Sequence, residues 1–272
     1  WEYKMKNIFE QLVILTKFMT RIPIPIKVNY DPKKLGKSIK FFPLVGLAIG
    51  LILYYSSIIL VKFSKNNLIN ALIVIVIELM VVGIIHIDGL CDTFDGLFSY
   101  REKEKMLEIM KDSRIGTNGA IILVLYFIAK ILFISEIFSI NLKYLMIYPI
   151  LARLATPVNA AFSDYARKNG MSNFIILQNS TFEGIFSIIL AAALSIIILS
   201  FKGFELFLGA FAFIILFMQF VKKKIDGVTG DTMGASLELT AIFVLFLAIF
   251  LKWEEGKNDD GVIIYSAWRN RP

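Results

Sequence analysis

Residues 68–96 read LINALIVIVIELMVVGIIHIDGLCDTFDG, a mostly apolar run that is followed at once by three aspartates. A run of about 20 apolar residues is long enough to cross the hydrocarbon core of a bilayer as a helix. Carboxylates are costly inside a bilayer, so those that follow such a run are expected at its surface. This stretch therefore predicts a membrane helix with an acidic group at one end.

The composition of the whole chain agrees with this interpretation. Of its 272 residues, 57% are hydrophobic and only 19% are charged, and the mean hydropathy is +0.70. Soluble globular domains are about half apolar and about a quarter charged. We therefore expect an all-α polytopic membrane protein. The apolar runs predict about seven transmembrane helices, at residues 42–61, 68–87, 119–138, 143–161, 183–201, 203–220 and 236–251.

The N-terminal part precedes the first of these helices. Residues 5–20 have the pattern of an amphipathic helix, which Pro23 and Pro25 would terminate because proline lacks an amide donor. A basic linker follows as far as Lys40. We accordingly divide the chain into an N-terminal helix and linker (1–41), a membrane catalytic domain (42–251) and a polar C-terminal tail (252–272).

The positive charge is distributed unevenly among the connecting regions. If the seven helices simply alternate, residues 1–41, 88–118, 162–182 and 221–235 share one face, and these regions hold 19 of the 29 Lys and Arg residues. The positive-inside rule then places the acidic loop in the cytoplasm and the C-terminus outside. The net charge of +7 thus has a topological explanation, and no nucleic-acid-binding module is recognisable. Homo-oligomerisation stays open.

The three aspartates after residue 87 are the strongest chemical signal. Asp88, Asp92 and Asp95 are spaced i, i+4 and i+7, so on a helix they share one face. Like charges this close need protons or a cation, and oxygen ligands of this kind suit Mg²⁺. A single cysteine and a single histidine exclude a zinc site built from several such ligands. The alternative is a solvated loop with glycine turns.

Two further groups of polar residues are expected on the same face. The first, at residues 111–114, holds Lys111, Asp112, Ser113 and Arg114 just before a predicted helix, where free amides and cations would cradle a phosphate. The charged residues 101–108 before it are typical of a solvated helix face. The second is a glycine-rich stretch at residues 226–234, in which Asp231 and threonine hydroxyls offer oxygen ligands. An ordinary glycine-rich loop after a basic segment is the alternative there.

Charged residues inside membrane helices indicate function or buried pairing. Glu78 lies deep in its predicted helix and is expected to pair with Lys130 or Arg153, as a structural ion pair or a substrate contact. Glu238 follows Asp231 closely and is the best candidate among these charges to join the acidic site. Cys91 is expected to be a packing residue, because the neighbouring carboxylates would raise the pKa of its thiol.

Several motifs together resemble the cobalamin synthase family, the adenosylcobinamide-GDP ribazoletransferases. The most specific are HIDGLCDTFDG at residues 86–96 and MLEIMKDSRIGT at 106–117. The shorter strings FMTRIPIP at 18–25, FFPLVG at 41–46 and TGDTMGA at 229–235 also match. The likeness runs in order over about residues 8–250. Cys91 stands where the family more commonly has a small residue such as alanine.

The resemblance implies a Mg²⁺-dependent membrane enzyme, integral to the cytoplasmic membrane of a prokaryote. It would join α-ribazole or its 5′-phosphate to adenosylcobinamide-GDP, releasing GMP and giving adenosylcobalamin or its 5′-phosphate. Its partners are therefore small-molecule substrates and the lipid bilayer. We expect carboxylates to hold one or two metal ions on the pyrophosphate, since metal ions and cationic side chains neutralise phosphate charge.

The residues are assigned to this chemistry as a hypothesis. Asp95 accepts the proton of the attacking ribazole 5′-hydroxyl, while Lys111 and Arg114 stabilise the departing GMP. The loop Gly227–Gly234 closes over the nucleotide or the ribazole. The expected metal ligands are Asp88, Asp92, Asp95, Asp112 and Asp231, and the expected substrate contacts are Ser113, Thr229, Gly230, Thr232 and Glu238.

Two alternatives belong to other classes. A CDP-alcohol phosphatidyltransferase also uses aspartates on membrane helices, but its pattern places Ala-Arg after the Asp-Gly pair, where this chain has Leu90 and Cys91. A cation or metabolite transporter would place its site near the middle of the bilayer. The polar residues of this chain gather at one surface instead, which favours surface chemistry.

Overall fold

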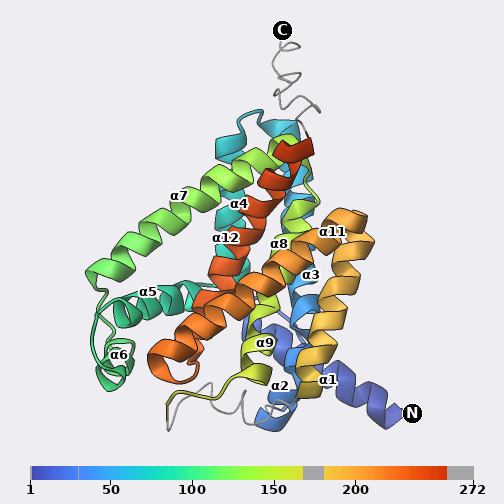
Figure 1. Ribbon diagram of the computed structural model, residues 1–272. Coiled ribbons are helices and arrows are strands. Elements are labelled where there is room, and N and C mark those ends of the chain that lie inside the picture. The colour runs from blue at the N-terminus through green and yellow to red at the C-terminus, as the bar shows by residue number, and fades with distance from the viewer. Residues whose placement is uncertain (1, 30, 168–180, 256–272) are drawn as a thin grey trace.

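The computed structural model describes residues 2–29, 31–167 and 181–255, and in this part of the chain helices form almost the whole fold (Figure 1). An isolated bridge between Tyr165 and Val228 is the β-structure recorded there. The predicted all-α class is confirmed. The elements are α1 (Glu2–Met19), α2 (Pro32–Ser38), the 3-10 helix η1 (Ile39–Phe41), α3 (Phe42–Phe63), α4 (Asn67–Val82), α5 (Ile85–Leu97), α6 (Lys103–Ile109), α7 (Thr117–Ile140), α8 (Tyr144–Arg153), α9 (Ala155–Phe162), α11 (Thr181–Ile225) and α12 (Gly230–Glu255).

The long apolar helices follow the predicted membrane segments closely. Within the described residues, five helical segments can cross a membrane by length and composition, or six if the bent pair α4 and α5 is counted as one. Among them α11 has 45 residues and contains Ser200 in a non-helical conformation with φ of 53°. The ribbon reverses its direction within α11 (Figure 1), so this element contains both predicted segments, 183–201 and 203–220.

The predicted continuous helix 68–87 is wrong at its end. Helix α4 stops at Val82, and α5 leaves it at an angle of 96°. Gly83 causes the break, because its φ of 84° lies in the left-handed region that side chains disfavour. The side chain of Arg21 also packs where a Cβ would stand, 2.9 Å from its Nε. As a result α5 runs across the end of the helical bundle instead of extending α4 (Figure 1).

The centre of the bundle is formed by α8 and α9, most of whose residues are buried inside the protein. Helix α3 packs closely on α8, and Gly46 and Gly50 permit the contact. A Cβ on Gly46 would lie 2.5 Å from the carbonyl oxygen of Pro149, and one on Gly50 would lie 2.6 Å from that of Met146. Glycines four residues apart allow membrane helices to approach at backbone distance. The weakest of the predicted apolar segments, 143–161, is therefore the most enclosed.

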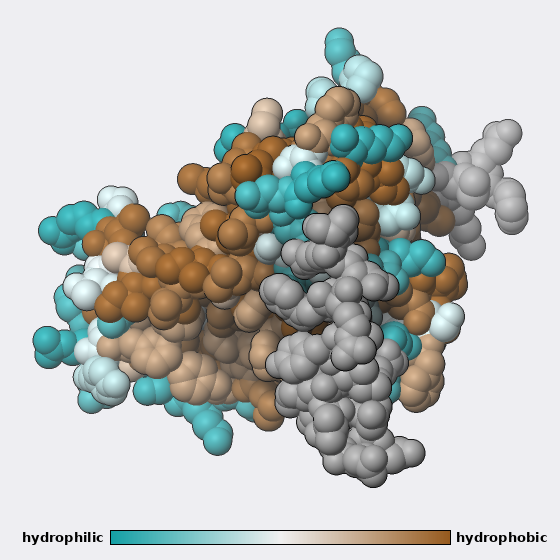
Figure 2. Space-filling model, turned by 90° about the horizontal axis from the view of Figure 1, so that it is seen from above, coloured by the Kyte–Doolittle hydropathy of each residue, from teal (hydrophilic) through white to brown (hydrophobic). Residues whose placement is uncertain are grey.

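Much of the outer surface is apolar, as the brown areas of Figure 2 show from above. Large hydrophobic side chains point outward from the long helices, as expected of helices that face lipid. Examples are Ile69, Leu72 and Val76 on α4, Val124, Leu125, Ile128 and Leu132 on α7, and Ile189 and Ile197 on α11.

The ends of the bundle differ in the elements that they carry. Helices α1, α2, α5 and α6 lie at the lower end of Figure 1, while the α3–α4 and α7–α8 connections lie at the upper end. The N-terminal helix predicted at 5–20 is confirmed as α1, and the charged helix predicted after Ser99 is confirmed as the shorter α6. Residues 256–272, most of the predicted polar tail, are outside the described residues.

Candidate active site

Helix α5 carries the three predicted aspartates across one end of the bundle. Asp88, Asp92 and Asp95 recur on one side of this helix, as their spacing requires. Asp88 is exposed, whereas Asp92 and Asp95 are half-buried. The acidic side of α5 is thus partly enclosed by protein and partly open to solvent.

The first turns of α12 cross α5 at backbone distance. A Cβ on Gly89 would lie 2.9 Å from the carbonyl oxygen of Asp231 and 3.0 Å from its Cα. One turn along α12, a Cβ on Gly234 would lie 3.3 Å from the Cα of His86. These two glycines bring together the acidic groups that the sequence places about 140 residues apart in two separate motifs.

Crowding of carboxylates affects the titration of α5. Partial burial raises the pKa of Asp92 to about 7, and the negative charges of Asp231, Asp88 and Asp95 act in the same direction. Burial and the same α5 aspartates also raise the pKa of the Cys91 thiol. The predicted effect of the carboxylates on Cys91 is confirmed. A cation bound among these carboxylates would relieve their repulsion.

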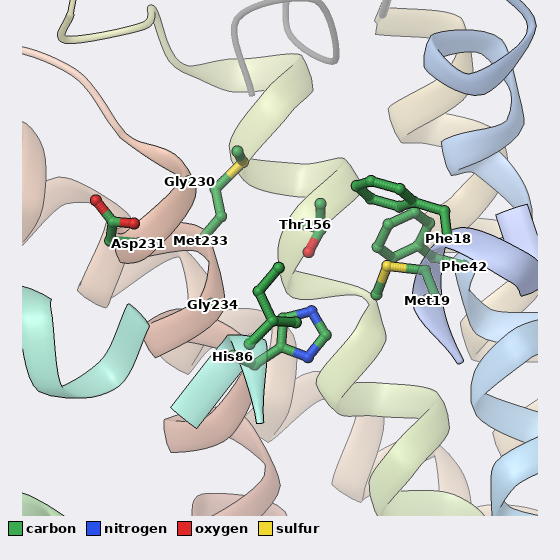
Figure 3. A pocket seen from close by; sticks show the side chains of 10 residues that line it. Phe18, Met19, Phe42, His86, Thr156, Gly230, Asp231, Met233 and Gly234 are labelled. Carbon is green, nitrogen blue, oxygen red and sulfur yellow. The ribbon is translucent and has the colours of Figure 1, made fainter. Parts of the chain in front are cut away.

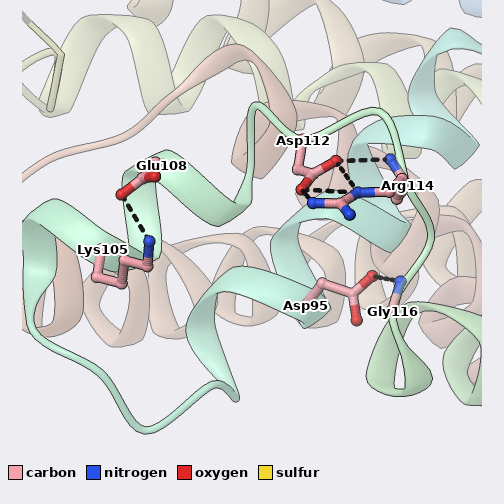
Figure 4. Close-up of polar contacts among 6 residues, drawn as sticks. All are labelled: Asp95, Lys105, Glu108, Asp112, Arg114 and Gly116. Atoms are coloured by element: carbon pink, nitrogen blue, oxygen red, sulfur yellow. Dashed lines mark hydrogen bonds and ion pairs between the residues drawn. The ribbon is translucent and has the colours of Figure 1, made fainter.

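Asp95 has a structural function that the sequence did not reveal. Its Oδ2 accepts a 2.7 Å hydrogen bond from the amide of Gly116 (Figure 4). Its Oδ1 accepts a 2.8 Å bond from the amide of Gly119. These amides belong to the N-terminus of α7, whose first turn has no intrahelical partners for them. The carboxylate therefore caps α7 and fastens the 110–116 loop to α5. Because both oxygens already accept bonds, we withdraw Asp95 as the proton acceptor.

The predicted phosphate cradle is an exposed loop next to Asp95. Asp112 accepts hydrogen bonds from the Arg114 guanidinium, at 2.6 Å from Nη2, and from its amide at 3.0 Å (Figure 4). These bonds lower the pKa of Asp112 to about 2. A pocket of about 410 Å³ separates this pair from Asp95. Lys111 and Ser113 are exposed on the same loop. In this arrangement Asp112 serves as a partner for Arg114 rather than as a neighbour of Asp92.

Asp231 has a cationic partner that the sequence analysis missed. The Nη2 atom of Arg167 lies 2.8 Å from Oδ2 of Asp231, and both side chains are largely buried. Arg167 is held near α12 by the short bridge in which Val228 donates to Asp164 and Ala166 donates to Val228, each at 2.9 Å. The signal in the sequence was weak, because Arg167 belongs to none of the recognised motifs.

The threonines predicted to contact substrate have a different function. The Thr229 amide donates to Oγ1 of Thr232 at 2.8 Å, and the Thr232 amide donates to Oγ1 of Thr229 at 3.2 Å. This reciprocal arrangement is a capping box, which satisfies free amides at the start of a helix. Both side chains are buried. Helix α12 consequently begins at Gly230, so the loop predicted at Gly227–Gly234 is wrong over its second half.

Glu238 lies in the interior of the bundle rather than beside α5. Its carboxylate accepts a very short hydrogen bond from the Tyr126 hydroxyl and lies 3.8 Å from Nζ of Lys130. Lys130 forms a 2.9 Å ion pair with Glu78, which also accepts a 2.8 Å bond from Tyr148. The predicted pairing of Glu78 with Lys130 is confirmed. Glu238 belongs to this buried network, and we remove it from the candidate site.

Arg153 is the second cation in the interior. Its side chain is 2% exposed, and its Nη1 donates a 3.3 Å bond to the carbonyl of Pro149 one turn earlier. Two buried cations, Lys130 and Arg153, thus balance the carboxylates of Glu78 and Glu238 in this part of the interior. Uncompensated charge in a membrane interior is expensive, so this balance explains how the four residues coexist there.

Comparison with known proteins identifies the family. The family model described as cobalamin-5-phosphate synthase matches residues 11–249. The chain belongs to the cobalamin-5-phosphate synthase family. The match contains all the helices from α2 to the last turns of α12, together with every motif on which the resemblance rested.

Curated relatives of this synthase family match over nearly their whole length. The adenosylcobinamide-GDP ribazoletransferase of Fusobacterium nucleatum is 39% identical over 88% of this chain and 96% of its own. The protein of the same name from Clostridium novyi is 38% identical over 90% and 98%, and that from Clostridioides difficile is 37% identical over 89% and 99%. No solved structure matches the chain. Membership in the synthase family leaves the phosphatidyltransferase and transporter alternatives without support.

The carboxylates fit a magnesium ion only in part. Within the described residues, no three His, Cys, Asp or Glu side chains stand close enough to hold a metal ion by themselves. Mg²⁺ needs fewer, because it usually takes one or two protein carboxylates and completes its octahedron with water and substrate phosphates. Asp88 and Asp92, one helical turn apart, provide oxygen ligands of this kind. Asp95, Asp112 and Asp231 already have partners on the protein.

Replacing Gly89 by alanine tests the importance of the α5–α12 crossing. The new methyl would meet the backbone of Asp231, which cannot rotate away, so the helices must separate. We expect a loss of about 1–3 kcal/mol in stability and a fall in turnover of more than about tenfold, since small displacements of reacting groups are costly. Thermal unfolding and initial rates measure both.

Gly209→Ala is the matched control for this substitution. A Cβ there would first meet the flexible end of the Leu247 side chain, and Gly209 lies on α11, away from the aspartates. Its turnover should stay within about twofold of the wild type. Equal activity losses in both variants would show that the crossing has no special importance for the site.

Proposed function

We propose that this synthase joins α-ribazole 5′-phosphate, or α-ribazole, to adenosylcobinamide-GDP with release of GMP, using Mg²⁺. The main support is the family match over residues 11–249, together with the aspartates of α5 and α12 where these helices cross and the exposed cations of the loop before α7. The description cobalamin-5-phosphate synthase favours the phosphorylated acceptor. The names of the relatives supply the two substrate classes.

The reaction exchanges one phosphorus–oxygen bond for another. A ribose hydroxyl of ribazole attacks the phosphorus that carries cobinamide, the bond from that phosphorus to the bridging oxygen breaks, and GMP leaves with the bridging oxygen. An acceptor that keeps a 5′-phosphate in the product cannot attack through its 5′-oxygen. We therefore replace the predicted attack by the ribose 5′-hydroxyl with attack by another hydroxyl of the ribose.

The aspartates of the proposed site have different roles in this reaction. Asp88 and Asp92 would hold Mg²⁺, which supplies charge neutralisation on the pyrophosphate when bound. Asp231 stands where α12 crosses α5 beside Gly89, and it is our choice for the group that accepts the hydroxyl proton. Arg167 keeps the Asp231 side chain in place through their 2.8 Å ion pair.

The cations near Asp95 suit the leaving group. Arg114 and Lys111 are exposed beside the 410 Å³ pocket, where a nucleotide phosphate could approach from solvent. An arginine can bind two phosphate oxygens at once, so negative charge on departing GMP would be stabilised there. Asp112 holds the Arg114 guanidinium next to this pocket until phosphate arrives.

A turnover assay tests the proposal directly. Purified protein in liposomes receives adenosylcobinamide-GDP and α-ribazole 5′-phosphate, and both GMP and the corrinoid product are followed by chromatography. We expect equal amounts of the two products, formed with Mg²⁺ and abolished by chelation. Release of GMP without a corrinoid–ribazole product would contradict the proposed acceptor, and full activity in chelator would contradict the metal.

We further propose that the active end faces the cytoplasm, in the cytoplasmic membrane. The end that carries α1, α5 and α6 includes most of the Lys and Arg residues, in accordance with the positive-inside rule. Cysteines introduced at Ser113 and Ser64 lie at opposite ends. In intact cells a membrane-impermeant maleimide should label Ser64→Cys and spare Ser113→Cys, and the reverse pattern would invert the topology.

A further inference from the structure

A second pocket lies beside the acidic site, on the other side of Asp231. Its volume is about 230 Å³, and it lies where the end of α1 meets the starts of α3, α5, α9 and α12. Gly230 and Asp231 line it together with residues from these other elements. The pocket therefore touches the group that we assign to proton transfer.

Most of the pocket wall is apolar, and a large part of it is buried. Phe18, Met19 and Phe42 form one side of the pocket, and Met233 lies opposite (Figure 3). Met19, Phe42 and Met233 are each less than 5% exposed. Aromatic rings and thioether groups are favourable neighbours for a flat aromatic ligand. The wall chemistry thus favours an aromatic group over a phosphate or a sugar.

Besides Asp231, two polar side chains interrupt the apolar wall. His86 and Thr156 lie between the aromatic side and Met233 (Figure 3). Among the described residues, Nδ1 of His86 is buried and has no hydrogen-bond partner. A buried polar atom without a partner is unfavourable, and most such atoms in proteins have one. A ligand with one suitably placed polar atom would satisfy it.

We propose that this pocket binds the aromatic base of ribazole, with His86 donating a hydrogen bond from Nδ1 to the free ring nitrogen. This inference rests on the proposed function. The base is a flat, two-ring heteroaromatic group in which one imidazole nitrogen carries ribose, so a single acceptor nitrogen remains. An apolar pocket with one unpartnered polar atom matches that pattern. The shared residue Asp231 then places the attached ribose at the acidic site.

The other parts of the substrates match the pocket less well. A corrin ring with its amide side chains is far too large for about 230 Å³. Guanine would fit by size, but it has several donors and acceptors along its edges. Buried polar groups need partners, and the apolar wall leaves most of these atoms without one. Guanine binding here is the main competing outcome of the test.

The experiment measures base selectivity in complete turnover assays. The ratio of kcat/KM for the 5,6-dimethylbenzimidazole riboside phosphate to that for the unsubstituted benzimidazole analogue is determined for two pocket variants. Thr156→Ile fills the pocket and should lower this ratio by about tenfold or more, while Met19→Ala enlarges it and should raise the ratio. Met218→Ala removes a buried methionine of α11 that does not line the pocket, so its ratio should not change.

A second comparison isolates the hydrogen bond of His86. The wild type should prefer the benzimidazole riboside phosphate over an indole analogue, which has a carbon in place of the free nitrogen. His86→Phe should reduce that preference at least about tenfold, whereas His86→Gln, which keeps a donor, should restore part of it. The KM for adenosylcobinamide-GDP should stay unchanged in each variant.

The results separate failure of the pocket from failure of the function. Unchanged base selectivity in all pocket variants, with an active wild type, would overturn the pocket assignment alone. A change in the preference for GDP over IDP on the corrinoid substrate would overturn it in favour of guanine. No corrinoid product from folded wild type would overturn the proposed function, and this inference with it.

Discussion

Replacing Asp92 by asparagine is expected to reduce turnover by about a thousandfold or more while the protein stays folded. Asp92 is half-buried on α5, one turn from Asp88, and its surroundings are rich in negative charge. Loss of this carboxylate would remove a magnesium ligand, and stabilisation of phosphoryl charge by metal ions and cations contributes several kcal/mol to such reactions. Initial rates of GMP release over a range of Mg²⁺ concentrations measure the effect.

The control is the same substitution at Asp226. This aspartate lies at the same end of the bundle and forms an exposed ion pair with Lys103 at 3.0 Å, the kind of pair that contributes little. Asp226→Asn should keep turnover within about twofold, in keeping with most surface changes. Wild-type activity of Asp92→Asn at every Mg²⁺ concentration would refute the metal assignment.

Lys130→Met is expected to have the largest effect on stability. Lys130 lies 2.9 Å from Glu78 and 3.8 Å from Glu238, and all three side chains are at most 10% exposed. Removing the cation would leave two buried carboxylates without their partner, which is expected to lower the stability by about 3–5 kcal/mol. Thermal or denaturant unfolding in a defined detergent would show this loss.

A second substitution separates charge from packing. In the double variant Lys130→Met, Glu78→Gln one carboxylate is neutralised together with the cation, so we expect a substantial part of the stability to return. Lys105→Met removes an exposed partner of Glu108 and should change stability by less than about 0.5 kcal/mol. If the double variant were as unstable as Lys130→Met, packing and not charge would explain the loss.

The sequence predicted the elements of this fold better than their ends. Apolar runs gave the long helices because a bilayer requires about 20 such residues in succession, and this requirement is visible without tertiary information. The end of α4 was missed because apolar residues continue through Ile84 and Ile85 after Gly83 has turned the chain. The hydropathy of a sequence contains no information on a backbone dihedral angle such as the φ of Gly83.

The start of α12 was missed for a related reason. Thr229 and Thr232 are polar and were interpreted as ligands, although they satisfy each other at the helix end. The usual capping-box signature has Glu or Gln at the later position, so a capping box was not predicted from Thr232. A polar side chain near a site can form hydrogen bonds with backbone amides as well as with a substrate.

The acidic site was predicted in part. The spacing of Asp88 and Asp92 was sufficient to place them together, because helical periodicity fixes neighbours within one element. Spacing gave no information on the partners of Asp95 at Gly116 and Gly119, which lie on another helix. The pairing of Arg167 with Asp231 likewise depends on how separate elements pack.

The enclosure of α8 and α9 has a consequence for the assembly of this protein in the membrane. This pair is the least apolar of the segments able to cross, and it contains Arg153, whose transfer to the middle of a bilayer costs about 2.5–3.5 kcal/mol on insertion scales. A segment of this kind is poorly inserted when it leaves the translocon alone. We expect it to enter the bilayer together with neighbours such as α3, on which α8 packs closely, so that the order of synthesis also becomes an order of assembly.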